Sequence, residues 1–233
     1  MKKIGIVGNG FVGSAIAAGF ALHSEVSIYD KDPKRSLDSL DKVVNESEFI
    51  FVGVPTPMES TTDGTISLHI LDSLMEEISS LNRRKDNIFI IKSTVVPGTT
   101  QKYIEKYPNL NIVFNPEFLT ERAARLEFIN ASRIVLGGDP ALCARVEGLY
   151  RDRFPITKII KTDTKSAEFI KYMCNCFFAT KVSFMNEMRQ AAHADALNWD
   201  DVMSGFLTDG RIGNSHIDVP GHDGSYGFGG KCF

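Results

Sequence analysis

The sequence lacks several features that would assign it to whole classes of protein. Its 233 residues contain four cysteines, and no two of them form the CxxC pair typical of a structural zinc site. No apolar run approaches the ~20 residues that span a bilayer. The 26 Lys and Arg nearly balance the 29 Asp and Glu, so the net charge of −3 gives no electrostatic footprint for nucleic acid or an anionic membrane. We therefore expect no metal site, no nucleic-acid partner and no membrane partner.

The N-terminal segment also lacks the pattern of a signal peptide. Residues 1–8 are typical of a short strand that enters a glycine turn. Without an export signal, the cysteines are expected to be reduced thiols of a cytoplasmic protein. Cys174 and Cys176 point to different faces of a helical stretch and cannot pair with each other, and we expect both to act as small buried hydrophobic residues. With 43% hydrophobic and 24% charged residues, the composition indicates a globular protein with a full-sized core.

A glycine turn stands between the first strand and the first helix. The segment Gly8-Asn9-Gly10-Phe11-Val12-Gly13 follows a strand that ends at Val7 and precedes the helix-forming residues 14–22. In the dinucleotide fingerprint the first glycine permits the tight turn, the second admits the pyrophosphate to the backbone, and the third lets the helix pack on the strand. The helix N-terminus would then bind the phosphates. A glycine turn without a cofactor is the alternative reading.

An acidic residue stands where the fingerprint requires one. Asp30 ends the second strand, residues 26–29, and follows Gly13 by 17 positions. Its carboxylate would accept hydrogen bonds from the adenosine ribose hydroxyls and would repel a 2′-phosphate. The pattern therefore predicts NAD rather than NADP, although the nearby cations Lys34 and Arg35 leave NADP open.

Strand and helix signals alternate through the first half of the chain. Strands are expected at residues 48–54, 87–92, 111–114 and 133–137, with helices at residues 66–81 and 100–107. Alternation of this kind, with strands that are apolar throughout, is typical of a Rossmann-like, doubly wound parallel sheet. Three polar loops follow these strands, at Pro55-Thr56-Pro57, Ser93-Thr94 and Asn115-Pro116-Glu117. Because ligands bind at the carboxyl ends of such strands, we expect the three loops to line one crevice.

The second half of the chain predicts a mostly helical domain. Residues 164–193 contain no Gly or Pro and carry apolar residues at helical spacing, so they predict one long helix capped by Thr162, Asp163 or Thr164. Its exposed apolar face predicts a homodimer. Lys171 and Asn175 lie one turn apart and interrupt the apolar pattern, either as functional groups or as a snorkelling lysine and a satisfied amide. We expect a NAD-binding domain at residues 1–162 and a central domain at residues 163–233.

The last residues combine glycines with a cysteine. Cys232 follows Phe228-Gly229-Gly230-Lys231, so its thiol can approach a bound ligand and act as a nucleophile. A mobile cysteine near the end of the chain is the alternative. Lys231 should lower the pKa of this thiol. A second helix is expected at residues 198–207, before a glycine-rich segment that contains Arg211-Ile212-Gly213-Asn214.

These motifs, taken in chain order, resemble those of the nucleotide-sugar 6-dehydrogenases, the UDP-glucose and GDP-mannose dehydrogenase family. The resemblance covers essentially the whole chain. It is carried by the glycine turn, by Val54-Pro55-Thr56-Pro57, Ser93-Thr94-Val95, Asn115-Pro116-Glu117-Phe118-Leu119, Glu168-Phe169-Ile170-Lys171 with Asn175, Arg211-Ile212-Gly213-Asn214, and the stretch from Gly227 to Phe233.

The resemblance implies NAD-dependent oxidation of a sugar C6 alcohol to a carboxylate, as in polysaccharide biosynthesis, with UDP-glucose the favoured substrate. Cys232 would add to the aldehyde and then carry a thioester. Lys171 and Asn175 would stabilise the oxyanion, Glu117 would act as general base, and Thr94 would position water. The family also implies cofactor contacts for Gly8, Gly10, Phe11, Val12, Gly13, Asp30, Arg35, Pro55, Thr56 and Thr94. It implies substrate contacts for Glu117, Phe118, Leu119, Lys171, Asn175, Arg211, Phe228 and Gly229.

Chains of this family continue beyond the cysteine through a Lys-Asp segment into a second α/β domain that binds the nucleotide of the substrate. Residues 1–233 contain neither, so we expect negligible dehydrogenase activity from these residues alone. Two other functions remain open from the sequence: a non-catalytic NAD-binding module, and a β-hydroxyacid-type NAD dehydrogenase. The latter type uses the lysine and the asparagine without a cysteine.

Overall fold

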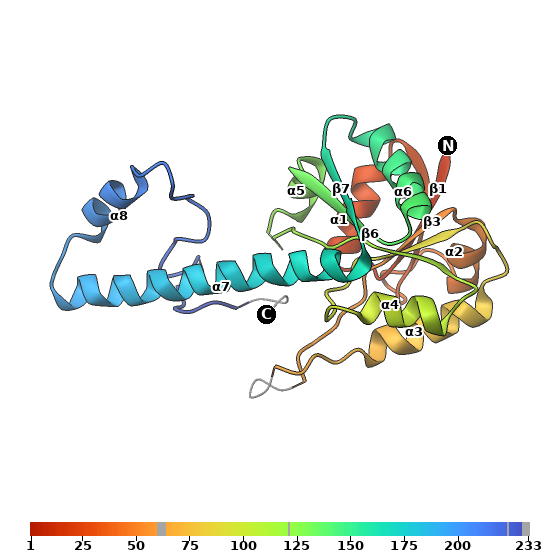
Figure 1. Cartoon of the computed structure of the whole chain (residues 1–233), viewed down its shortest axis with the longest axis horizontal. Helices are drawn as coiled ribbons and strands as arrows, with labels where there is room; N and C mark the ends of the chain where they lie inside the picture. Colours follow the sequence, from red (N-terminus) through yellow and green to blue (C-terminus); the bar gives the residue numbers. More distant parts are fainter. Residues whose placement is uncertain (60–63, 121, 223, 230–233) are drawn as a thin grey trace. The chain divides into compact units, whose positions relative to one another are not determined.

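The computed structural model describes residues 1–59, 64–120, 122–222 and 224–229 (Figure 1). The described residues fall into two compact units, Met1–Lys171 and Tyr172–Phe233. The predicted domain boundary after residue 162 stays a prediction.

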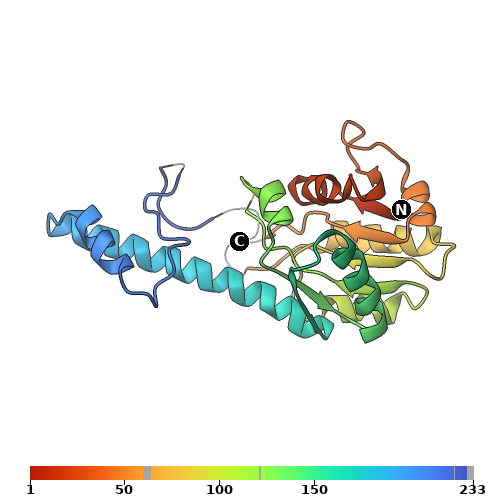
Figure 2. The same cartoon turned by 90° about the horizontal axis from the view of Figure 1, so that it is seen from above.

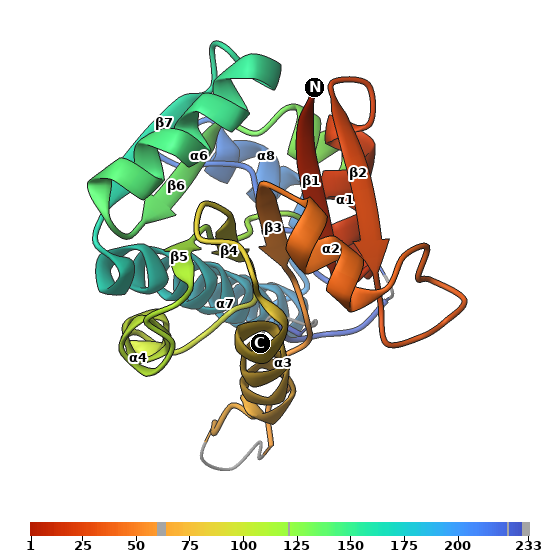
Figure 3. The ribbon, with the colours of Figure 1, turned by 90° about the vertical axis from the view of Figure 1, so that its right-hand side faces the viewer.

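The described part of the first unit is built on one seven-stranded sheet. Its strands lie in the order β2-β1-β3-β4-β5-β6-β7, which Figure 3 shows from the side. Their bounds are β1 Lys2–Val7, β2 Ser24–Tyr29, β3 Phe49–Val52, β4 Ile88–Ile91, β5 Asn111–Phe114, β6 Arg133–Gly137 and β7 Lys158–Thr162. The strand order reverses direction between β1 and β3, which is where doubly wound sheets bind ligands.

Helices cover both faces of the sheet, so its central strands β3 and β4 are apolar and buried throughout. The first face carries α1 (Phe11–Phe20), α5 (Ala124–Ile129) and α6 (Pro140–Arg153), and the second carries α2 (Leu40–Glu46), α3 (His69–Leu81) and α4 (Thr99–Lys106). In Figure 1, α3 and α4 lie below the sheet. Successive side chains of a strand point to opposite faces: Phe51 packs against the first group of helices and Val52 against the second. The expected doubly wound fold is confirmed.

The long helix α7 runs from Thr164 to Ala194, close to the predicted range of 164–193. Of the three candidate caps, Asp163 accepts hydrogen bonds from the backbone N–H of Ser166 (2.8 Å) and from its hydroxyl (2.6 Å). These bonds, the hydroxyl first, hold the pKa of Asp163 below its ordinary value.

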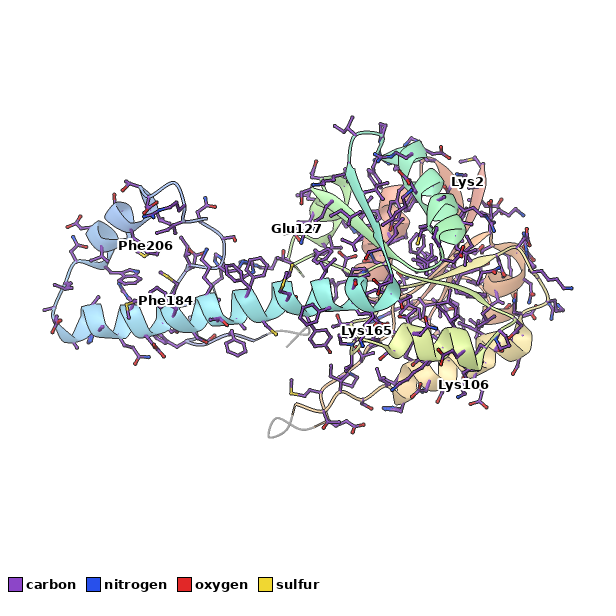
Figure 4. The ribbon with its side chains drawn as sticks, viewed as in Figure 1. Lys2, Lys106, Glu127, Lys165, Phe184 and Phe206 are labelled. Atoms are coloured by element: carbon purple, nitrogen blue, oxygen red, sulfur yellow. The ribbon has the colours of Figure 1, made fainter. Side chains whose placement is uncertain are left out.

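The second unit has a small apolar core of its own. Met185 of α7 packs with Ile217 and Val219, and the helix α8, Trp199–Leu207, adds Met203 and Phe206. Figure 2 shows α8 alongside the C-terminal half of α7, and Figure 4 labels Phe206 on α8 and Phe184 on α7. The expected helix at residues 198–207 is confirmed, and Asn198 caps it with a hydrogen bond from the N–H of Asp200.

The structure corrects two expectations. The pair β5–β6 is antiparallel and meets at Phe114 and Gly137, so the sheet is mostly, rather than wholly, parallel. Cys176 is exposed on α7, and only Cys143 of the three described cysteines is buried. Fewer residues of α7 are therefore buried than its many apolar residues predict. Among the described residues, no helix is long and apolar enough to cross a membrane, and no cluster of His, Cys, Asp or Glu could hold a metal ion.

Candidate active site

Two glycines of the turn after β1 are required by the chain itself. Gly8 has a φ of +94°, and a Cβ there would lie 2.7 Å from the carbonyl oxygen of Gly53. A Cβ on Gly13 would lie 2.0 Å from the carbonyl oxygen of Gly8, which no side chain tolerates. Gly8 therefore lets β1 and the end of β3 approach at the switch point, and Gly13 lets α1 begin directly beside the turn.

Gly10 is different, because the fold does not need a glycine there. Its φ is −76°, and no described atom lies within 4 Å of the place where a Cβ would stand. Among the described residues, no side chain caps the N-terminus of α1. Open space at a helix N-terminus, where the dipole is positive, suits a phosphate, so the turn fits a dinucleotide. Phe11 and Val12 form the first turn of that helix.

Asp30 is fixed beside the glycine turn. Its Oδ2 accepts a 2.6 Å hydrogen bond from the backbone N–H of Asn9, and its Oδ1 accepts one of 2.8 Å from the N–H of Asp32. A carboxylate has about four lone-pair positions, so it retains acceptors for two ribose hydroxyls. Arg35 pairs with Asp32 at 3.6 Å, and its carbonyl oxygen accepts a hydrogen bond from the Asn9 side chain.

The loops after β3 and β4 are joined by hydrogen bonds. The Thr56 hydroxyl donates to the carbonyl oxygen of Thr94, and the Ser93 hydroxyl donates to that of Val54, both at 2.7 Å. The structure thus brings Pro55, Thr56 and Thr94 together at the carboxyl ends of neighbouring strands. Whether these loops line a ligand crevice stays a prediction.

A buried ion pair lies at the ends of β4 and β5. Lys92 Nζ lies 2.9 Å from Oε2 of Glu117, and the two residues are 5% and 8% exposed. Oε1 of Glu117 accepts hydrogen bonds from the backbone N–H groups of Phe118 (2.6 Å) and Leu119 (3.0 Å). Oε2 is buried and, despite its contact with Lys92, accepts no hydrogen bond of ordinary geometry from any described group.

The ion pair belongs to a larger polar network. Lys92 Nζ also donates to Oδ1 of Asn115 (3.2 Å), which accepts a second bond from the Tyr150 hydroxyl (2.6 Å). Burial, and next the charge of Glu117, raise the pKa of Tyr150 well above its ordinary value, so the phenol stays a donor. A cavity of about 350 Å³ adjoins the network and is lined in part by Lys92, Glu117, Arg133 and Tyr150.

Lys171 lies near this network on the first turns of α7. Its Nζ lies 5.6 Å from the centre of the Phe118 ring, and the Arg133 guanidinium lies 4.2 Å from the same ring. Lys171 is buried, with 4% of its surface exposed. Glu168, one turn earlier, is fully buried and accepts hydrogen bonds from the N–H groups of Gly98 and Thr100 at the start of α4. Within the first unit, Thr94, Glu117, Phe118, Leu119 and Lys171 thus belong to segments that are hydrogen-bonded or packed together.

The remaining predicted residues lie in the second unit. Asn175 follows Lys171 by one turn of α7, while Arg211 is exposed and pairs with Asp209 through two nitrogens. Phe228 is exposed, and Gly229 follows it. Cys232 lies outside the described residues, so its role stays a prediction.

Two side chains of the second unit hold the segment that carries Arg211 and Phe228. Lys181 Nζ donates to the carbonyl oxygens of Gly213 (2.5 Å) and Ser215 (2.6 Å). Oδ1 of Asn186 accepts a 2.9 Å hydrogen bond from the N–H of Gly227. Both residues lie on α7, so this helix holds the backbone at Gly213, Ser215 and Gly227.

Four polar residues that hold these segments together were not predicted from the sequence: Lys92, Asn115, Tyr150 and Glu168. Lys92 closes a strand whose other residues are apolar, and this pattern is the one signal that could have revealed it. Tyr150 lies within an unpredicted helix, and nothing in its neighbourhood marks its hydroxyl as buried.

Comparisons with known proteins agree with this geometry. A family model described as the NAD binding domain of the UDP-glucose/GDP-mannose dehydrogenase family matches residues 35–153, and the model of that family's central domain matches residues 165–233. UDP-glucose 6-dehydrogenase YwqF of Bacillus subtilis is 32% identical over 203 residues, which are 84% of this chain and 44% of that protein.

Two solved structures share the fold. A UDP-glucose dehydrogenase of Pyrobaculum islandicum has a TM-score of 0.83 at 27% identity and covers 100% of this chain and 61% of its own. A GDP-mannose dehydrogenase of Pseudomonas aeruginosa has a TM-score of 0.78 at 25% identity, over 90% of this chain and 57% of its own. This chain thus spans about half the length of such relatives. Its glycine turn, its fold and the matches to both domain models show that the chain belongs to the UDP-glucose/GDP-mannose dehydrogenase family.

Proposed function

We propose that the protein is an NAD-dependent nucleotide-sugar 6-dehydrogenase, which oxidises the C6 alcohol of UDP-glucose to a carboxylate. The observation that carries this proposal is the buried Lys92–Glu117 pair. It leaves one carboxylate oxygen without a hydrogen bond of ordinary geometry, on a loop whose Phe118 packs near Lys171. A buried base near a buried ammonium suits chemistry in which a proton is lost while an oxyanion forms.

The cofactor would be held by the first unit. Gly10 and the N-terminus of α1 would receive the pyrophosphate, Asp30 the adenosine ribose, and Pro55, Thr56 and Thr94 the nicotinamide half. When bound, NAD⁺ accepts the hydride that leaves the substrate carbon. Because Asp30 would repel a 2′-phosphate and Arg35 is paired with Asp32, we favour NAD over NADP.

The chain's own residues would divide the four-electron oxidation into two steps. Oxidation of the alcohol gives an aldehyde, to which the Cys232 thiolate adds to form a thiohemiacetal. Loss of a second hydride, for which a second NAD⁺ would be the acceptor, gives a thioester on Cys232. Lys171 and Asn175 would stabilise the oxyanion at C6, by charge and by an amide donor. Water, positioned by Thr94, would then attack the thioester while Glu117 takes its proton, and the thiolate would leave.

The substrate assignment depends on the relatives. Several curated relatives are named UDP-glucose 6-dehydrogenases, whereas a structural relative is a GDP-mannose dehydrogenase, so we propose UDP-glucose with GDP-mannose as the comparison substrate. Arg211 would approach the substrate diphosphate, and Phe228 and Gly229 would contact the sugar. A product of this kind suits polysaccharide biosynthesis in the cytoplasm.

We also propose a homodimer formed through α7. Met173, Phe177, Phe184 and Met188 are 57%, 63%, 48% and 40% exposed and repeat at intervals of four or seven positions. Residues at this spacing form one stripe along a helix, and water-exposed stripes of large apolar residues mark association sites. A second copy of the same helix offers a complementary surface.

The decisive experiment measures NADH formation by the protein expressed from the complete reading frame, with UDP-glucose, GDP-mannose or a β-hydroxyacid as substrate. We expect NADH with UDP-glucose and a loss of at least a thousandfold in the Cys232→Ser variant. Turnover of a β-hydroxyacid that is unchanged in Cys232→Ser would favour a β-hydroxyacid dehydrogenase. Calorimetric NAD binding without NADH formation from any substrate would favour a non-catalytic module.

A further inference from the structure

Lys92 is buried, whereas most lysines lie at the protein surface. It is 5% exposed at the carboxyl end of β4, where the neighbouring strand residues Ile90 and Ile91 are fully buried. Bringing an ammonium group into such surroundings is unfavourable unless it meets a charge and hydrogen-bond acceptors. Both are supplied by the segment after β5, through Oε2 of Glu117 and Oδ1 of Asn115.

The orientation of the Asn115 amide follows from its partners. Its Nδ2 donates a 2.8 Å hydrogen bond to the carbonyl oxygen of Val135, while its Oδ1 accepts from both Lys92 and Tyr150. The reverse orientation would set two donors against the ammonium group and two acceptors against each other. Asn115 therefore fixes Nζ of Lys92 from one side, and Glu117 receives it from the other.

The two carboxylate oxygens of Glu117 have different partners. Oε1 is taken up by two backbone N–H groups, whereas Oε2 is directed by the Lys92 ammonium group alone. Lys92 and Glu117 both line the cavity of about 350 Å³, which has room for water next to them. Among the described side chains, Lys92 is therefore the one that directs Oε2, while backbone groups hold Oε1.

We propose that Lys92 is the positioning residue for Glu117 in the hydrolysis of the thioester. Lys92 holds Oε2 toward the water that attacks C6. As the water oxygen bonds to C6, one water proton passes to Oε2, the C–S bond breaks and Cys232 leaves as a thiolate. This inference rests on the proposed function, because it gives Lys92 a part in the step that releases the product.

Other charged or titratable groups surround the pair and enter its electrostatics. Tyr150 contributes from α6 through Asn115, and Arg133 and Glu127 line the same cavity from β6 and α5; Lys171 of α7 lies above Phe118. Figure 4 labels Glu127 on α5. Of these groups, Lys92 is the one that contacts Oε2 among the described residues, at 2.9 Å. The test therefore changes Lys92 and keeps the others.

The test compares Lys92→Met, Glu117→Gln and Tyr150→Phe with the wild type, in the protein expressed from the complete reading frame. NADH formation from UDP-glucose is followed in the stopped flow, and the quenched protein is weighed by intact mass spectrometry. For Lys92→Met we expect a burst of NADH, a kcat at least tenfold lower with little change in KM, and accumulation of the sugar adduct on Cys232. Glu117→Gln should behave in the same way.

Tyr150→Phe is the matched control, because it removes a buried hydrogen bond from Asn115 while leaving the ion pair intact. It should turn over without accumulating the adduct. A Lys92→Met variant that is slow without the adduct, or a Tyr150→Phe variant that accumulates it equally, would overturn the inference. If Lys92→Met does not fold, Lys92→Gln replaces it, made both in the wild type and in the Glu117→Gln variant. An equal fold-decrease in kcat in the two backgrounds would show that Lys92 and Glu117 act independently and would contradict the inference. A wild type that forms no NADH would overturn the proposed function as well.

Discussion

Oε1 of Glu168 accepts a 2.7 Å hydrogen bond from the backbone N–H of Thr100, which lies 68 positions earlier in the chain. Oε2 accepts a second bond, of 2.5 Å, from the N–H of Gly98. The carboxylate of α7 thereby caps the N-terminus of α4, where a negative charge is favourable. This contact joins the segment after β4, which carries Thr94, to the helix that carries Lys171.

Replacing Glu168 by Ala should lower the free energy of unfolding by about 2–4 kcal/mol, because two buried N–H groups lose their acceptor. Glu168→Gln keeps one amide oxygen and should lose roughly half as much. Urea unfolding followed by circular dichroism measures both. Glu187→Ala, at an exposed position of the same helix, is the control and should stay within about 0.5 kcal/mol of the wild type. Equal losses at positions 168 and 187 would refute the capping role.

The glycine turn offers a pair of substitutions with opposite outcomes. Gly13→Ala would place its Cβ against the carbonyl oxygen of Gly8 and should destabilise the fold by about 3 kcal/mol or more. Gly10→Ala meets no described atom and should leave stability within about 1 kcal/mol of the wild type. It should nevertheless weaken NAD binding at least tenfold, because the methyl group stands where the pyrophosphate approaches. Thermal unfolding and calorimetry separate the two effects, and unchanged NAD affinity in Gly10→Ala would contradict the assignment.

Stability should fall at alkaline pH. Burial raises the pKa of Cys143 to about 11, and it raises the pKa of Tyr150 well above its ordinary value of 10.0. The folded state then holds protons that the unfolded state releases, so this stabilisation is complete below pH 9 and declines as the pH rises. Each group contributes a slope of about 1.4 kcal/mol per pH unit, Cys143 between about pH 9 and 11 and Tyr150 above pH 10.

Urea unfolding at pH 8, 9.5 and 10.5 measures this decline. Cys143→Ala should lower the slope of the curve between about pH 9 and 11, and Tyr150→Phe should lower it above pH 10. Tyr226→Phe, at an exposed position, should leave the shape of the curve unchanged. Parallel curves for all four proteins would show that these groups do not cause the decline.

The apolar stripe of α7 predicts the effect of one charge on assembly. Phe177→Glu would place a carboxylate in the proposed interface, opposite the same carboxylate of the second copy. Because the two charges repel, the dissociation constant of the dimer should rise at least a hundredfold. Leu22→Glu changes another exposed apolar residue, which lies outside α7, and should leave the dimer intact. Light scattering over a concentration series measures both proteins. A wild type that is monomeric at all concentrations would remove the proposal.

The sequence predicts the elements whose signals are local. The glycine turn, the apolar strands and the helix at 164–193 are marked by residues that lie next to one another, and these elements form close to the predicted bounds. Four elements, α2, α5, α6 and β7, were not predicted. The first two have 7 and 6 residues, too few for a clear period, and β7 carries lysines at both Lys158 and Lys161. The start of α6 was readable, because Asp139 caps it and Pro140 occupies its first turn.

The site is less readable than the fold because its contacts are distant in sequence. The partners of Glu117 and Asn115 come from positions 92 and 150, and those of Glu168 from positions 98 and 100. A single sequence shows that a lysine ends a strand or that a tyrosine lies in a helix, but the pairing exists only once β4, β5 and α6 have packed. Motifs identify residues that meet ligands, whereas the residues that hold them in place are identified by the structure.

The short pairing between β5 and β6 is the weakest connection within the sheet. One residue pair joins these strands, whereas six pairs join β1 to β2 and five join β6 to β7. The side-chain amide of Asn115 donates a hydrogen bond to the carbonyl oxygen of Val135 on β6. This bond connects the two strands where they share almost no backbone hydrogen bonds. A sheet under thermal stress opens where it has the fewest bonds, so β6, α6 and β7 should exchange their amide protons as one subdomain. Glu117, the base of the proposed hydrolysis, would then lie beside the weakest pairing of the sheet. Asn115 would both connect β5 to β6 and orient the Lys92–Glu117 pair.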